Sequence, residues 1–237
     1  MARRATTVAA TGTLGVVLAL GLSGCVGDLG GPAVTREVEI SDVDAVALGT
    51  SGDLVVRRGA TPSLTVTASE RLHDRLVSEV RDGVLVLEAE RGPGRGSDLS
   101  YELVLPELAD LTVSGSGDVS GTDVTGDRLR VLVQGSGEVE LGGLDVEDAL
   151  VSVKGSGDVG LSGRTASLSV SIEGSGDVDT DDLRAATASV SIEGSGEVDL
   201  HATDRLTVSI AGSGSVTYSG SPQVEQRIEG SGRVSRD

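Results

Sequence analysis

The sequence lacks the large aromatic side chains that usually fill a globular core. Its 237 residues include no Phe, no Trp, two Tyr, one Met and one Cys, whereas Gly occurs 35 times. Aromatic anchors dominate the interior of ordinary domains of this length, so the composition argues against a conventional core. It also argues against disorder, because 38% of the residues are hydrophobic and nearly all of these are aliphatic. The composition therefore predicts a thin, regular, aliphatic core.

Basic residues are scarce as well. The chain carries 19 Lys and Arg against 37 Asp and Glu, which gives a formal net charge of -18. A surface of this sign repels the phosphates of nucleic acids and the headgroups of anionic lipids. We therefore expect no nucleic acid among its partners.

The N-terminus predicts export and lipid attachment. A basic start is followed by the uncharged apolar run Val8–Gly21, which is shorter than the ~20 residues of a membrane-spanning helix. The next four residues, Leu22-Ser23-Gly24-Cys25, resemble the lipobox of bacterial lipoproteins. Residues 1–24 are therefore predicted to be a lipoprotein signal peptide, with Cys25 as the lipidated residue. The alternative is an ordinary secretory signal with an incidental cysteine.

The mature chain is expected to be held on the outer face of a membrane. Cys25 is the only cysteine, so the chain can form no internal disulfide and the thiol is free for lipidation. Cleavage before it leaves 17 basic and 37 acidic residues, a net charge of -20. Residues 25–36 are predicted to be the lipidated cysteine and a flexible tether, and two or more acyl chains anchor a protein stably.

From residue 111 onward a short motif recurs, which reads Gly-Ser-Gly, an acid and Val in five copies. Successive first glycines lie 20, 20, 19, 20, 18 and 18 residues apart, and the last two copies replace the acid. A period near 20 is typical of a solenoid, whose units bury their apolar faces against their neighbours. The paired glycines of the five copies are Gly115 and Gly117, Gly135 and Gly137, Gly155 and Gly157, Gly174 and Gly176, and Gly194 and Gly196; Gly212 and Gly230 open the last two copies.

Aliphatic residues stand at fixed positions around each motif. In all seven copies, the residue two before the first Gly and the residue four after it are Val or Ile, and mostly polar residues separate the aliphatic positions. This period of two, with β-branched side chains, is a strand pattern. The sequence predicts an all-β fold, a parallel β-helix with ~20-residue coils. The varying coil length favours the right-handed form over the left-handed hexapeptide form.

The region before the repeats is less regular. We divide the mature fold into irregular coils over residues 37–110 and regular repeats over 111–237, with a separate N-terminal domain as the alternative. An imperfect copy, Thr50–Leu54, lies 65 residues before the first full motif, which leaves room for about three longer coils. Within this gap the patterns predict strands at Ser63–Ala68 and Tyr101–Leu105, a turn at Arg81–Gly83 and one helical turn near Glu70–Leu76.

Three segments in fixed order carry a resemblance to a known family. They are the runs Glu70–Leu76 to Glu79–Leu87 and Tyr101–Leu108, followed by the Gly-Ser-Gly-acid repeats. In these segments the chain resembles the bacterial head GIN domain of auto-transporter adhesins. The resemblance covers roughly residues 37–235. It implies a secreted or lipid-anchored protein with a β-helix-like structure and carries over no catalytic residue. Many members have an aromatic near the first strand where this chain has Val43 and Val46, so we expect a thinner core there.

The acids of the repeats are candidate ligands. Stacking places them in one outward row about 4.8 Å apart, where like charges repel. The expected solution is that each acid turns into solvent and accepts hydrogen bonds from nearby backbone N–H groups. The alternative is Ca²⁺ bridging adjacent coils. The row comprises Asp118, Glu138, Asp158, Asp177 and Glu197.

An enzyme remains the alternative to a binding protein, because parallel β-helices often cleave polysaccharides with clustered acids. Asp179, Asp181 and Asp182 are close together in sequence. However, aromatic platforms for sugars are limited to Tyr101 and Tyr218, and His73 and His201 lie in no catalytic motif.

The last repeat differs from the others. Gln226, Arg227, Arg233 and Arg236 replace apolar or acidic residues of the earlier copies. Solenoid ends expose unpaired strand edges and need protection from end-to-end association. The substitutions therefore predict a polar cap, or else a degenerate final copy.

These observations predict a lipid-anchored solenoid on the extracytoplasmic face of the cell membrane. We expect a non-enzymatic adhesion or interaction module that binds a surface protein or glycan and needs no cofactor. The alternative is a carbohydrate-active β-helix enzyme, a polysaccharide hydrolase or lyase.

Overall fold

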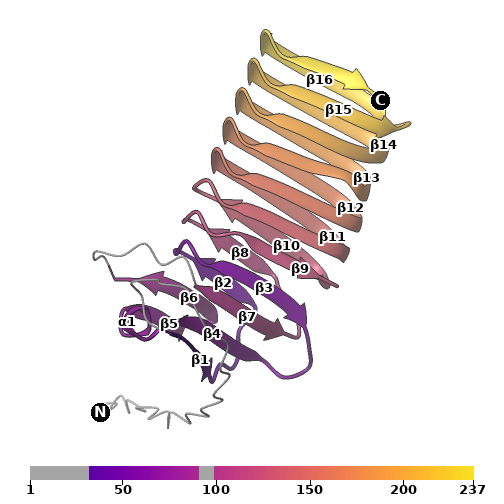
Figure 1. Ribbon diagram of the computed structural model, residues 1–237. Coiled ribbons are helices and arrows are strands. Elements are labelled where there is room, and N and C mark those ends of the chain that lie inside the picture. Colours follow the sequence, from indigo (N-terminus) through magenta and orange to yellow (C-terminus); the bar gives the residue numbers. More distant parts are fainter. Residues whose placement is uncertain (1–31, 91–98) are drawn as a thin grey trace, which may run out of the picture.

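The computed structural model describes residues 32–90 and 99–237, which form 17 strands and one short helix (Figure 1). The regular rungs stack like a ladder toward the C-terminus, and the N-terminal strands gather at the opposite end. The predicted signal peptide (residues 1–24), Cys25 and most of the tether lie outside the described residues.

The repeats form a parallel β-solenoid of about six turns, as the periodicity predicted. Neighbouring coils pair in parallel so that equivalent residues stack: Val131 pairs with Val151, Val151 with Val170, and Val170 with Val190. The strands are β8 (Asp110–Val113), β9 (Val119–Thr122), β10 (Thr125–Val133), β11 (Glu138–Gly155), β12 (Asp158–Gly174), β13 (Asp177–Gly194), β14 (Glu197–Gly212), β15 (Ser215–Gly220), β16 (Gln223–Gly230) and β17 (Arg233–Arg236).

The aliphatic columns form the core. Val139, Val153 and Ile172 are all fully buried, and the polar residues between them face outward. Each coil also buries inward residues beyond these columns, such as Leu141 and Leu144 in β11. Because each rung is covered by the next, every inner coil removes its apolar side chains from water.

The two motif glycines have different structural roles. The first lies at a corner, where Gly174 has φ of +142°, a conformation that side chains rarely adopt. The second is buried and faces inward. A Cβ on Gly176 would lie 2.2 Å from the Gly157 carbonyl oxygen and 2.7 Å from Val153 Cγ1. Glycine at both positions therefore lets successive coils approach within strand-pairing distance.

The imperfect copy lies directly beneath the first full motif. Strands β2 (Ala45–Leu48) and β3 (Asp53–Arg58) pair in parallel with β8 and β9. Strands β6 (Val84–Ala89) and β7 (Ser100–Leu105) form the next rung, below β2 and β3. The expectation of about three intervening coils is therefore wrong. The intervening chain passes under the β2–β3 rung, so rung order differs from chain order.

Antiparallel strands close this lower end. β4 (Ser63–Ser69) pairs antiparallel with both β1 (Ala33–Val38) and β7, and β5 (Leu76–Arg81) pairs antiparallel with β6. The predicted turn joins β5 to β6, with Asp82 and Gly83 both at positive φ, and the predicted helical turn is α1 (Glu70–His73). We call this closed end the base.

The base holds the largest buried side chains rather than a thinner core. Val43 and Val46 are buried at the expected position, and Leu residues supply the volume beside them. Tyr101 is fully buried there, and the Thr50 hydroxyl donates a 3.4 Å hydrogen bond to its phenolic oxygen. The single core aromatic thus has a partner for its polar atom.

Candidate binding surfaces

The acidic row lies on the outside of the solenoid, as the alternation predicted. Asp118, Asp158 and Asp177 are exposed, and each accepts a backbone hydrogen bond at 3.1 Å from the coil above. The donors are the N–H groups of the next acids in the row, namely Glu138, Asp177 and Glu197. Each Asp thus contributes one bond between adjacent coils, which offsets part of the repulsion within the row.

Glu does not form this bond. Above Glu138, the Asp158 N–H donates instead to the Gly137 carbonyl at 3.3 Å. Above Glu197, the Ser215 N–H donates to the Gly196 carbonyl at 3.1 Å. The shorter Asp side chain reaches the neighbouring N–H, and the extra methylene of Glu carries its carboxylate beyond it. Asp and Glu positions of the row therefore differ in the acceptor that the N–H group of the next coil uses: a carboxylate above Asp and a glycine carbonyl above Glu.

Other acids on the flank are paired with cations from neighbouring coils. Arg164 makes two contacts with Asp145, at 2.8 and 2.5 Å, and Lys154 lies 3.0 Å from Glu173. The hydrogen bond from Arg164 holds the pKa of Asp145 below its usual value. These side chains are well exposed, so the pairs contribute little to stability.

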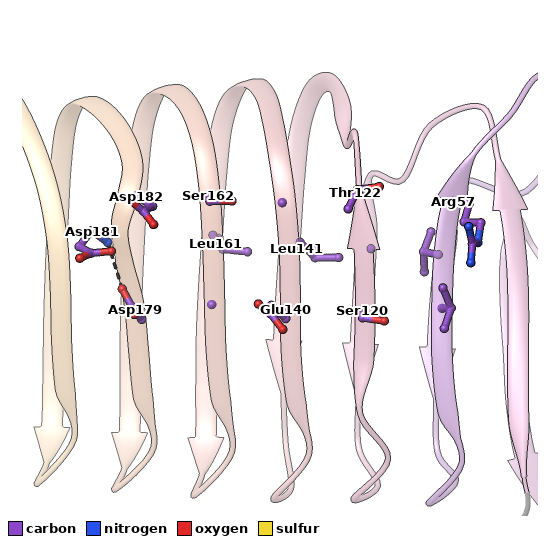
Figure 2. Close-up of a pocket in the computed structure, with 15 residues that line it drawn as sticks. Arg57, Ser120, Thr122, Glu140, Leu141, Leu161, Ser162, Asp179, Asp181 and Asp182 are labelled. Atoms are coloured by element: carbon purple, nitrogen blue, oxygen red, sulfur yellow. Dashed lines mark hydrogen bonds between the residues drawn. The ribbon is translucent and has the colours of Figure 1, made fainter.

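A groove of about 510 Å³ crosses five neighbouring strands on one flank (Figure 2). In register along it stand Val55, Ser120, Glu140, Gly160 and Asp179, from β3, β9, β11, β12 and β13. The middle of the groove is lined by glycines and small hydroxyl residues together with Glu140, Leu141 and Leu161, and the small residues leave the surface hollow there (Figure 2). It is open along its length and suits an extended ligand.

The two ends of the groove differ in charge. Arg57 lies at the base end, and the acid cluster of Asp179, Asp181 and Asp182 lies at the other (Figure 2). Thr180 pairs with Leu200 while Arg184 pairs with the adjacent His201, so the residues between them bulge from the strand. The bulge carries Asp181 and Asp182, whereas Asp179 precedes it in regular register with Asp199. The bulge also borders a second groove of about 280 Å³ beside Tyr218.

The structure brings the three predicted acids together. The Asp181 N–H donates a 3.2 Å hydrogen bond to Asp179 Oδ1. The negative charge of Asp179 is the main reason that the pKa of Asp181 is raised. The residues described include no group of three or more His, Cys, Asp or Glu arranged to hold a metal ion.

Of the other polysaccharide candidates, Tyr218 lies near this cluster, because it lines the second groove together with Asp181. Tyr101 is buried in the base, which removes it as a sugar platform, whereas Tyr218 is half-buried beside the second groove. His73 Nε2 lies 2.7 Å from the Val34 carbonyl oxygen, and His201 Nδ1 lies 2.8 Å from Ser219 Oγ. Both histidines are half-buried with structural partners.

Sequence reasoning missed the groove itself. Its central residues Ser120, Glu140, Gly142 and Ser162 follow no repeated pattern, because they belong to outward positions that vary from coil to coil. Only the register between coils aligns them. The departures from the repeat, such as Gly160 where its neighbours carry Glu and Asp, were the available signal.

The C-terminal end of the solenoid is uncovered. All eight residues of β16 are exposed, including Val224 and Ile228 at 37% each. The equivalent residues one coil earlier, Leu206 and Ile210, are almost fully buried. Within the described residues no further element covers β16, the strand of the last copy where the sequence predicted a polar cap or a degenerate repeat.

In the described part of the chain, no helix is both long and apolar enough to cross a membrane. The strands and grooves define a class: a parallel β-solenoid with one closed end, one open end and grooves along its flank. The family model described as "Putative auto-transporter adhesin, head GIN domain" matches residues 42–222. The chain belongs to this family, as the three sequence segments indicated.

Several solved structures share the fold. A putative adhesin from Bacteroides fragilis is 23% identical with a TM-score of 0.83, and the match covers 87% of this chain and 97% of that one. A putative adhesin from Parabacteroides merdae is 23% identical with a TM-score of 0.68 and the same coverage. A putative lipid binding protein from Parabacteroides distasonis is 27% identical with a TM-score of 0.74, again over 87% and 97%. No curated protein matches the chain.

Proposed function

We propose that this protein is a lipid-anchored, extracytoplasmic adhesion module that binds a surface protein or glycan without catalysis. The observation that carries the proposal is the open groove along the flank, which crosses five strands. A rigid stack of hydrogen-bonded coils holds its lining residues at fixed spacing. Such a preformed surface binds an extended ligand at a low cost in ordering the protein.

The position of the base supports anchoring through Cys25. The described chain begins at Pro32, and β1 is one of the strands that close the base. A lipid on Cys25 would lie seven residues before this point. The base would then face the membrane, and the solenoid would project its groove and its open end outward.

The charge of the groove narrows the ligand class. Glu140 and the three clustered acids outnumber Arg57, the basic residue among those lining it. The small hydroxyl residues along its middle offer hydrogen bonds to a polar chain. We infer a neutral or basic extended ligand, such as a neutral glycan or a basic peptide segment. The Parabacteroides distasonis protein is described as a putative lipid binding protein. An acidic lining would repel anionic lipids, so these fit the groove less well than a neutral or basic ligand.

The acid cluster is the feature that favours the alternative, a polysaccharide-cleaving enzyme. A carboxyl group with a raised pKa beside an ionised one is the pairing that glycosidases use. In this protein all three side chains are exposed, with Asp181 and Asp182 on the bulge, and Asp179 is engaged by the Asp181 backbone. An exposed carboxyl group is not held in the water-poor setting in which acid catalysis is efficient.

One variant pair tests the groove. A Cβ added to Gly160 would contact only Glu140 Cγ, at 3.8 Å, so Gly160→Gln should fill the groove without disturbing the fold. Ser189→Gln adds the same side chain at an exposed position of β13 that does not line it. Capture of envelope proteins and glycans should fall with Gly160→Gln and persist with Ser189→Gln.

Two further results would decide between binding and catalysis. A glycan-degradation screen with the wild-type chain is expected to give no product. Turnover of any glycan that is lost in Asp181→Asn would replace the adhesion proposal with the enzyme alternative.

The anchor has its own test. Cys25→Ser should move the protein from the membrane fraction to the soluble extracytoplasmic fraction. Retention of this variant in the membrane fraction would contradict lipidation at Cys25.

A further inference from the structure

We propose that β16 at the open end is an interface for a second copy of this chain. The two copies would join end to end, with their β16 strands antiparallel and related by a two-fold axis through Gln226. Within the described residues, β16 pairs with β14 on one side and with no strand on the other. An unpaired strand edge is a template for another strand.

Hydrogen-bond direction shows which residues of β16 point away from the stack. In an earlier coil, Arg130 and Gln134 donate their N–H groups to the coil below, at 2.8 and 2.7 Å. The parallel register makes Glu225 the equivalent of Arg130, and Ser231 continues the same alternation by donating to Gly212 at 2.8 Å. The even-numbered residues Val224, Gln226 and Ile228 therefore direct their backbone groups toward the open side.

Antiparallel pairing of two such edges must place even-numbered residues opposite even-numbered residues. A register centred on Gln226 places Val224 opposite Ile228 of the second copy, and Ile228 opposite its Val224. Both are apolar and 37% exposed, whereas the equivalent residues in the preceding coil are buried. The pairing would continue the aliphatic core across the junction.

The same register also matches the charges. It places Glu225 opposite Arg227 of the second copy, and Arg227 opposite its Glu225. Shifting the centre to Arg227 would place Arg227 against itself, and shifting it to Glu225 would place Glu225 against itself. Directly opposed like charges destabilise strand pairs. Among these three central registers, only the one centred on Gln226 is complementary in both apolar and charged residues.

Gln226 accounts for the break in the aliphatic column. It stands in register with the buried Val208, where a Val would complete the pattern. At the two-fold axis the amide of Gln226 would meet the amide of Gln226 in the second copy. Each amide can donate a hydrogen bond to the other and accept one from it. A single polar residue in an apolar interface can fix register and partner number, as Asn does in coiled coils.

The base presents different edges from the open end. Among the described residues, β1 pairs with β4 alone and β5 with β6 alone, so the free edges there belong to β1 and β5 and not to the parallel strands of the stack. The lowest parallel strands of the base, β6 and β7, are each already paired on both sides, because β5 and β4 run antiparallel beside them. An interface that uses the same surface on both copies closes as a dimer rather than a fibre. One rung is a small interface, so we expect weak association that many copies on a surface would strengthen.

The arrangement gives the adhesion proposal a specific partner. If the base faces the membrane, as the proposed function requires, two copies joined at their open ends have their anchors at opposite ends of the dimer. The partner would be the same protein on a facing cell. This step rests on the proposed function, whereas the pairing of β16 does not.

Sedimentation over a range of concentrations tests the pairing, with the Cys25→Ser chain to keep lipid out of the measurement. We expect a monomer–dimer equilibrium. Arg227→Glu and Glu225→Arg should each weaken it about tenfold or more, because each places like charges opposite one another twice. The double variant should restore it. Equal melting temperatures of all four proteins would show that the fold is intact.

Mixing the two single variants is the sharper test. A Glu225→Arg chain and an Arg227→Glu chain are complementary in the Gln226-centred register, so they should associate with each other and not with themselves. A wild-type chain that stays monomeric at all concentrations would overturn the proposal. So would a dimer that is indifferent to both single variants.

Vesicle clustering separates this inference from the proposed function. Phosphatidylcholine vesicles with a nickel-chelating lipid would carry the chain through a histidine tag at its N-terminus or at its C-terminus. N-terminal attachment should cluster vesicles and C-terminal attachment should not. A dimer in solution without clustering would retain the β16 interface and contradict its role between facing membranes.

Discussion

Gly52 lies directly beneath Gly117, although 65 residues separate them in the chain. A Cβ on Gly117 would stand 2.2 Å from the Gly52 carbonyl oxygen. The two glycines therefore occupy equivalent positions in adjacent rungs, and the intervening residues form the closed base. This contact makes the irregular N-terminal region and the regular repeats one continuous stack with one core.

The inward glycines should be intolerant of even the smallest side chain. Gly176→Ala places Cβ 2.2 Å from the Gly157 carbonyl oxygen, a backbone atom that cannot rotate away. We expect a loss of about 1–3 kcal/mol in the free energy of unfolding, measured by chemical denaturation. Gly160→Ala is the control, since its Cβ would meet only Glu140 Cγ at 3.8 Å. Equal stability of the two variants would contradict the close approach of the coils.

Tyr101 should be the most sensitive side chain in the base. Tyr101→Ala removes a fully buried ring and should cost about 3–5 kcal/mol. Tyr101→Phe keeps the ring and loses the 3.4 Å hydrogen bond with Thr50, so it should cost about 1 kcal/mol. Chemical denaturation of the two variants measures both losses, and equal losses would contradict the burial of the ring.

The same residue predicts a pH dependence at high pH. Burial raises the pKa of Tyr101 above its ordinary value of 10.0, so the unfolded chain loses this proton before the folded one. Its contribution to stability is complete below about pH 10 and falls as the pH rises above it. Denaturation midpoints measured at rising pH should therefore decline more steeply in the wild type than in Tyr101→Phe. Parallel declines would show that Tyr101 ionises freely in the folded state.

The acid cluster should show coupled titration. Repulsion from Asp179 is the main cause of the raised pKa of Asp181. The folded chain therefore binds this proton more tightly than the unfolded chain, which favours folding at acidic pH and is lost as the pH rises through the raised pKa. In Asp179→Asn, carboxyl carbon chemical shifts should report a lower pKa for Asp181. An unchanged titration would assign the shift to another cause.

The acidic row gives the final prediction. Asp118, Asp158 and Asp177 already accept backbone N–H groups, so calorimetric titration with millimolar Ca²⁺ should give no heat and no thermal shift. Asp158→Ala, which removes the acceptor for the Asp177 N–H, should lower the denaturation midpoint more than Asp158→Asn does. Heat of binding that Asp158→Asn abolishes would favour the calcium alternative.

Much of the fold follows from the sequence alone. Val and Ile recur at a fixed spacing around Gly-Ser-Gly, and each must face inward because strand side chains alternate. Stacking of identical units is then the one way to bury every column, which determines the parallel solenoid, its coil length and the outward position of the acids. The hairpin at Asp82-Gly83 was also predictable, because its turn residues act locally.

Two features depend on contacts between distant segments, and only the tertiary structure determined them: the order of the rungs in the base and the groove. No local pattern places β2 and β3 on top of β6 and β7, because that order results from antiparallel strands that cover the base and bury Tyr101. The groove likewise exists only once Ser120, Glu140 and Gly160 are brought into register. Periodicity determines how one coil folds. The ends of the stack depend on which strand edges remain to be paired, and the groove depends on the register that this pairing sets between coils.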